Sequence, residues 1–293
     1  MLHRPAHARP ARLALAIAIA SASLSLATTA KAEEETAPPS AFTVSGSAAI
    51  VSDYRLRGVS QSNNGFAIQA GVTVAHQSGF YAGAWGSNLA GWGTFGGPNL
   101  EVDLIGGYKK TVGPATIDAG LTWYMYPGGA NKTDYAEPFV KVSTTVGPVS
   151  MLGGVAYAPK QQALGKWYNS GASAATGIYD HPGAKMDNLY LWGDVNGGVP
   201  HTPVNLKAHL GYSKGNSGLG PNGTSVAPSG QYLDWMLGAE VVLGRFVLGV
   251  SYVDTNITKA DRDHLSPNFT KFQTAGGDSI SSGRAVFSAT VNF

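Results

Sequence analysis

The sequence predicts an all-β protein: a closed, antiparallel transmembrane β-barrel of about 12 strands with short periplasmic turns and longer extracellular loops. Three observations predict it. Segments of about ten residues alternate between apolar and polar side chains, and the connections between them alternate between short and long. Glycine accounts for 39 of the 293 residues, whereas only 13% are charged. Such repetition is typical of a barrel whose strands each have one face toward lipid and one toward a polar interior.

The first element, residues 1–32, is typical of a secretory signal peptide. Three arginines precede an apolar run at residues 13–26, and Ala30-Lys31-Ala32 resembles a cleavage site. Removal of this peptide lowers the number of basic residues from 20 to 16, against 18 acidic residues. A near-neutral chain without a basic patch argues against a nucleic-acid partner.

The rest of the chain divides into a leader and a barrel. Residues 33–41 are acidic and contain proline, which predicts a short periplasmic leader. Residues 42–293 form the predicted outer-membrane barrel. No part of them has the roughly 20 consecutive apolar residues of a spanning helix, so a helical membrane protein is not expected. The sequence contains no cysteine, so neither a disulfide nor a thiolate metal site is expected.

Twelve segments alternate with a period of two. They are residues 42–57, 66–74, 80–88, 100–109, 115–124, 135–146, 150–158, 188–195, 204–213, 232–243, 246–254 and 284–293. An even number of strands places both ends of the barrel chain on the periplasmic side. The two longest connections could hide another hairpin, so 10 or 14 strands remain as alternatives.

The connections form two interleaved sets. The short set comprises residues 76–79, 112–114, 147–149, 196–198 and 243–245. The long set comprises residues 60–64, 89–99, 127–134, 159–185, 215–231 and 255–283. Outer-membrane barrels place short turns on the periplasmic side and longer loops outside, so we expect the long set to be extracellular.

Ionisable residues within the predicted strands fall on the phase opposite the apolar residues. A Lys or Arg facing lipid at mid-depth costs about 2–4 kcal/mol, so this phase should line the lumen. The predicted lumen-lining residues are Asp53, Arg55, Arg57, Glu101, Asp103, Lys109, Asp118, Glu137, Lys141, Asp194, Lys207, His209, Asp234, Glu240 and Arg284. Lys110 departs from the pattern, but it lies beside a predicted turn, where a long side chain can reach the membrane surface.

Aromatic residues on the apolar phase collect near the ends of the predicted strands. Trp and Tyr favour the two membrane interfaces, so two aromatic girdles are expected. Phe42, Tyr108, Phe246 and Phe293 belong to the short-turn end. Tyr54, Phe66, Trp123, Tyr157, Tyr212, Trp235 and Tyr252 belong to the long-loop end.

The C-terminal segment alternates strictly over residues 285–293 and ends on Phe293. This resembles the terminal strand signature that the barrel-assembly machinery recognises in outer-membrane proteins. Ser288 stands where that signature often has glycine. The expected partners are therefore this machinery and outer-membrane lipid.

Several segments together resemble the TorF-type porin family of Gram-negative bacteria, over nearly the whole chain after residue 32. They are SDYRLRGVSQS at residues 52–62, GFYAGAWGSN at 79–88, EVD at 101–103, GGY at 106–108 and YLDW at 232–235. The resemblance implies an outer-membrane barrel that acts as a porin.

Three function classes remain open on the sequence. The first is passive diffusion of small solutes through a lumen with eight acidic residues, six Lys or Arg and one His. In a barrel of this size the same charges could instead pair and fill the interior, which would give a closed or plugged barrel. A structural or surface-recognition barrel that uses a Gly- and Ser-rich loop, residues 215–230, is the second class.

An outer-membrane lipid or peptide hydrolase is the third class, and it would need a nucleophile or water beside an oriented base. His209 is the only histidine on the lumen phase of a predicted strand, and no His-x-Ser arrangement accompanies it. We therefore expect no catalytic residue. No pair of histidines stands at ligand spacing and no glycine-rich loop opens a helix, so neither a metal nor a cofactor is expected.

Overall fold

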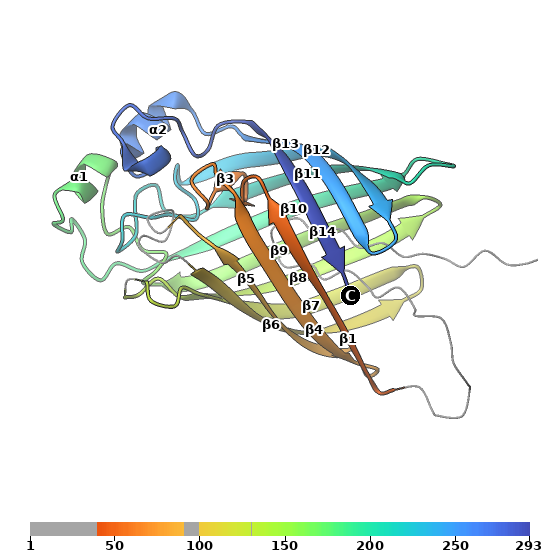
Figure 1. Cartoon of the computed structure of the whole chain (residues 1–293). Helices are drawn as coiled ribbons and strands as arrows, with labels where there is room; N and C mark the ends of the chain where they lie inside the picture. The colour runs from red at the N-terminus through yellow and green to blue at the C-terminus, as the bar shows by residue number, and fades with distance from the viewer. Residues whose placement is uncertain (1–39, 91–99, 130) are drawn as a thin grey trace, which may run out of the picture.

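The computed structural model describes residues 40–90, 100–129 and 131–293 of the chain. Within these residues, twelve strands close into one antiparallel barrel (Figure 1). The predicted fold class is thereby confirmed. The predicted signal peptide, most of the predicted leader and most of the predicted loop 89–99 lie outside the described residues.

The barrel strands follow one another around the wall in chain order. They are β1 (Phe42–Val51), β4 (Ala67–His76), β5 (Phe80–Asn88), β6 (Leu100–Val112), β7 (Ala115–Met125), β8 (Tyr135–Val146), β9 (Val149–Gln161), β10 (Met186–Gly198), β11 (Val204–Lys214), β12 (Gln231–Leu243), β13 (Phe246–Thr255) and β14 (Arg284–Asn292). The first and last strands pair with each other, with Ile50 opposite Ala289, which leaves no free sheet edge.

Short turns occupy one end of the barrel and the long connections occupy the other. Gly113 and Gly244 adopt positive φ in two of the short turns, a conformation that glycine adopts without steric cost. The long connections hold α1 (Gly171–Ala175), α2 (Lys259–Leu265) and the 3-10 helix η1 (Lys271–Gln273) (Figure 1). No helix in the described ranges is both long and apolar enough to span a membrane.

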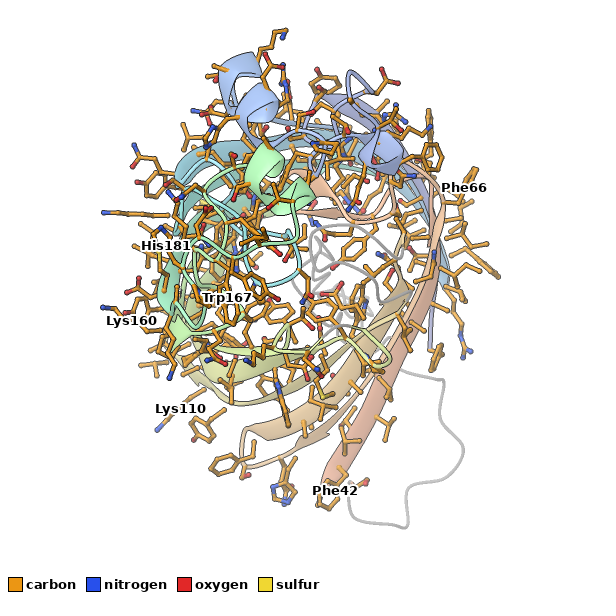
Figure 2. The ribbon with its side chains drawn as sticks, turned by 90° about the vertical axis from the view of Figure 1, so that its left-hand side faces the viewer. Phe42, Phe66, Lys110, Lys160, Trp167 and His181 are labelled. Carbon is orange, nitrogen blue, oxygen red and sulfur yellow. The ribbon has the colours of Figure 1, made fainter. Side chains whose placement is uncertain are left out.

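The strands alternate between an exposed outer wall and a buried interior. Exposed outer-wall residues include Leu121, Leu210 and Val140, whereas their neighbours along the same strands, such as Thr122 and His209, are buried. Figure 2 shows Phe66 and Lys110 pointing away from the barrel. Period-two alternation therefore separates an apolar outside from a polar inside.

Large aromatic side chains of the interior lie over glycines on neighbouring strands. The ring of Trp192 covers Gly154, and that of Phe139 covers Gly120. A Cβ at either glycine would overlap the ring above it. Glycine is therefore required where an aromatic side chain lies flat against the inside of the wall.

Substitution Gly154→Ala is expected to destabilise the barrel by about 1–3 kcal/mol, because the new methyl group forces Trp192 out of place. The free energy of unfolding in urea measures the loss. Gly153→Ala is the matched control, since a Cβ there would lie 4.0 Å from the nearest atom, on the outer wall. Equal losses for the two variants would contradict the packing argument.

Candidate functional site

Residues 52–66, which we call the inserted loop, connect β1 to β4 and turn into the barrel. Residues 53–64 of this loop are all buried. Two short strands, β2 (Arg55–Leu56) and β3 (Val59–Ser60), pair antiparallel within it. Arg57 and Gly58 form its tip, with φ angles of 49° and 79°. The loop is therefore a hairpin with its tip inside the barrel.

This arrangement corrects two sequence predictions. The predicted strand 42–57 ends at Val51, so Asp53, Arg55 and Arg57 belong to the inserted loop instead of the wall. Tyr54 is not a membrane-interface residue: only 2% of it is exposed, and its ring lies 5.5 Å from that of Trp85 inside the barrel.

The inserted loop is held together by its own polar side chains. The Asp53 carboxylate accepts hydrogen bonds from Arg55 Nε at 2.8 Å and from Ser60 Oγ at 2.5 Å. Arg55 Nη1 donates to the carbonyl oxygens of Gly58 and Ser282, both at 2.8 Å. Buried polar groups require such partners. None of these hydrogen bonds involves the Arg57 side chain, so the hairpin is held together independently of that side chain.

The tip is bound to the wall through Arg57. Its Nη2 lies 2.8 and 2.7 Å from the two carboxylate oxygens of Glu137 on β8, and its Nη1 donates to Asn188 Oδ1 on β10 at 2.7 Å. The guanidinium carbon lies 4.2 Å from the centre of the Tyr190 ring. The side chains of Arg57 and Glu137 are 5% and 3% exposed, so this is a buried ion pair.

A second network lies on β10, β11 and β12. His209 Nδ1 is 2.6 Å from Asp194 Oδ1, and its Nε2 is 3.0 Å from Asp234 Oδ1. The hydroxyl of Tyr190 lies 2.9 Å from the same Nε2. Asp194 and His209 face each other across the β10–β11 ladder, so the strand register brings them together.

The remaining interior charges of the middle and the short-turn end also pair. Asp118 lies 3.2 Å from Lys141 and 3.7 Å from Lys109, and both lysines stand directly opposite it in the neighbouring strands. Lys207 lies 2.8 Å from Glu240. This part of the wall is therefore lined by groups of opposite charge instead of a band of one charge.

The structure places the other predicted residues near the loop end. Glu101 and Asp103 are buried on β6, where the hydroxyl of Tyr126 donates to Glu101 at 3.3 Å. Arg284 is exposed at the loop end of β14 and donates to the carbonyl oxygen of Asn64 at 3.2 Å.

A cavity of about 90 Å³ lies between the inserted loop and the middle of the wall, beside the contacts of Arg57. Its lining includes Arg57 and Gly58 of the loop and Lys141, Trp192 and His209 of the wall. Ionised side chains and aromatic faces both border this space. The cavity therefore suits a small polar or charged solute.

The long connections 162–185, 215–230 and 256–283 pack into a loop cap over the same end of the barrel. Their shared apolar cluster includes Trp167, Leu219, Leu265 and Phe269, each at most 4% exposed. Figure 2 shows Trp167 among these connections at the loop end. The inserted loop joins the cap through Val59, which belongs to the same cluster.

Sequence reasoning missed Asn188 and Tyr190 as site residues. Both share the interior phase of β10 with the predicted Asp194, so alternation alone could have found them. They were missed because only ionisable residues were assigned to the lumen.

The family model of a bacterial protein of unknown function (Gcw_chp) matches residues 35–275. The chain belongs to this family. No curated protein sequence matches this Gcw_chp chain. Among solved structures, the NanC porin matches with a TM-score of 0.51 and 11% identity, over 86% of this chain and 99% of that chain.

Two further structures match this Gcw_chp chain less well. OmpT, an outer membrane protein of Vibrio cholerae, has a TM-score of 0.38 and 10% identity, over 87% of this chain and all of that chain. The anion-selective porin from Comamonas acidovorans has a TM-score of 0.35 and 10% identity, over 86% of this chain and 98% of that chain. At such identities the NanC likeness shows the barrel fold alone.

Proposed function

We propose that this Gcw_chp protein is an outer-membrane channel for passive diffusion of small polar solutes, with the inserted loop as its constriction. The observation that carries the proposal is the interior itself. Ion pairs such as Lys141–Asp118 line a closed barrel, and a cavity separates them from a loop whose tip is bound at Glu137. The resemblance to TorF-type porins and the fold shared with the NanC porin support the same function.

Ion current through the purified protein in a planar lipid bilayer tests the proposal. Small polar solutes include the ions of the bath, so a channel gives discrete current steps. Liposome swelling with solutes of increasing size then sets the size limit that the constriction imposes. A complete absence of current steps at every voltage, in a preparation that migrates as a folded barrel, would overturn the proposal.

The location in the outer membrane is supported by the outer wall. Leu121 of β7 and Phe287 of β14 are exposed there, in the way that lipid-facing residues of a barrel are. Of the predicted interface aromatics, Phe42, Phe66, Tyr108, Trp123, Tyr157, Phe246, Tyr252 and Phe293 are exposed, and Tyr212 and Trp235 are half-buried. We propose that these rings contact the membrane lipid and that β14 is the strand recognised by the barrel-assembly machinery.

A charge placed at mid-depth on the outer wall tests this location. Leu121→Arg is expected to lower the free energy of unfolding in lipid by about 2–4 kcal/mol, because an arginine there faces hydrocarbon. Val112→Arg, at the short-turn end of β6 on the same wall, is the control and should cost at most about 1 kcal/mol. Equal costs in lipid would indicate that the wall does not face a membrane.

The geometry of His209 supports a non-enzymatic function. A general base needs a free ring nitrogen within reach of the proton that it removes. Both ring nitrogens of His209 are hydrogen-bonded to carboxylates, of Asp194 and Asp234. Hydrolysis of a lipid or peptide substrate that is lost in His209→Ala would revive the enzymatic alternative.

A closed structural or surface-recognition barrel is the second candidate, and the loop cap favours it. The apolar cluster around Leu219 and Phe269 lies at the end of the barrel through which a solute would enter. The two candidates differ in one measurement. A closed barrel gives no current even after the inserted loop is removed, whereas a constricted channel then gives a larger current.

A further inference from the structure

The part of the wall that receives Arg57 has the chemistry of a guanidinium site. Glu137 supplies two carboxylate oxygens, Asn188 supplies an amide oxygen, and Tyr190 supplies an aromatic face. A planar guanidinium is recognised by this combination, since its N–H groups donate in the plane and its face stacks on a ring. A compact ammonium group cannot make all of these contacts at once.

The three recognising side chains belong to the rigid wall. Glu137 stands on β8 opposite Thr122, and Asn188 and Tyr190 stand on β10 opposite Ala158 and Ala156. The inserted loop supplies only the group that is bound. Because that hairpin is held by Asp53 and Arg55, loss of the Arg57 side chain should leave the wall site formed and vacant.

We propose that Glu137, Asn188 and Tyr190 form a binding site for guanidinium-bearing solutes, which Arg57 occupies as an intramolecular ligand. A free guanidinium compound then competes with Arg57 for the same three side chains. The adjoining cavity of about 90 Å³, which Glu137 and Tyr190 also line, gives room for a small substituent. Binding of a guanidinium compound at this site does not require that the barrel conducts. Its entry through the pore rests on the proposed channel function.

The energetics favour a cation when Arg57 is absent. Glu137 is 3% exposed at its side chain and Arg57 is its only ion-pair partner among the described residues. A buried carboxylate without a partner is destabilising, so Glu137 favours the binding of a cation once Arg57 is removed. In the wild-type protein Arg57 is tethered at the site, so a free solute has to displace it and binds more weakly than to a variant without Arg57.

Isothermal titration of the detergent-solubilised full chain with methylguanidinium tests the site. The Arg57→Ala variant should bind methylguanidinium saturably. It should bind methylammonium at least about tenfold more weakly, because methylammonium cannot make all of the charged hydrogen bonds that a guanidinium makes. The double variant Arg57→Ala/Glu137→Gln should lose methylguanidinium affinity by at least about tenfold for the same reason. Arg245→Ala, which removes an arginine from the turn between β12 and β13, is the charge-matched control and should bind like the wild-type protein.

Heat-modifiable migration on a gel verifies that each variant is folded, and Arg57→Ser replaces Arg57→Ala if the latter does not fold. If neither variant folds, methylguanidinium is titrated into the wild-type protein and into Glu137→Gln, and the affinities of these two proteins are compared. The proposal is overturned if the folded variant shows no saturable binding, if methylammonium binds equally well, or if Glu137→Gln has no effect. Because binding is measured without current, loss of conductance with retained binding would overturn only the channel function.

Discussion

Replacement of residues 54–64 by a short Gly-Ser turn is expected to raise the single-channel conductance several-fold. The inserted loop narrows the interior at the level of Glu137 and Asp234, and its residues Leu56, Arg57 and Gly58 border the cavity. Its removal widens the narrowest part of the path and exposes the charge of Glu137 to the lumen. The measurement is single-channel recording in planar bilayers, with folding verified by heat-modifiable migration.

The control for this variant is a replacement of similar size elsewhere in the loops. Residues 176–183 are exposed and lie outside the barrel interior, so a short turn in their place should leave the conductance unchanged. An unchanged conductance after removal of the inserted loop would show that the loop is not the constriction.

Loss of the Glu137 carboxylate is expected to produce the largest loss of stability. Glu137→Ala leaves the buried guanidinium of Arg57 without its counter-ion, which costs about 3–5 kcal/mol of unfolding free energy. Unfolding in urea measures the loss. The double variant Glu137→Ala/Arg57→Ala should lose less than Glu137→Ala alone, because no buried charge is then left unpaired.

The control for the ion pair is Asp263→Ala, which breaks the exposed pair of Lys259 and Asp263. These side chains are 78% and 62% exposed, and surface pairs of this kind contribute little. A loss for Glu137→Ala as small as that for Asp263→Ala would mean that Arg57 does not depend on Glu137 for its place in the barrel.

The strands were predictable because each one has an exposed apolar face on the outer wall and a buried, more polar face in the interior. Segments such as 115–124 and 204–213 alternate strictly, and they form β7 and β11. The inserted loop was not predictable from the same rule. Tyr54 and Leu56 continue the apolar phase of Ile50, yet they pack inside the barrel, because alternation reports two environments without saying which is lipid. Gly58 and the run Asn63-Asn64-Gly65 were the available turn signals.

The candidate site was predictable as a set of residues but not as a set of contacts. Charges such as Asp118 and Lys141 had to face inward, since lipid excludes them. Their pairing depends on register, which places each lysine opposite its aspartate only after the sheet has formed. Arg57 and Asn188 are 131 positions apart, and no local pattern connects them.

The place of the inserted loop inside the barrel is tested most directly by the reactivity of a single cysteine in that loop, since the chain itself contains no cysteine. Leu56, next to the tip, is 5% exposed, whereas Ile178 of the loop cap is 74% exposed. In the folded protein, Leu56→Cys is therefore expected to resist a water-soluble maleimide while Ile178→Cys reacts readily, and both should react once the protein is unfolded. Equal reaction of the two cysteines in the folded protein would contradict this structure, because the loop would then lie in solvent.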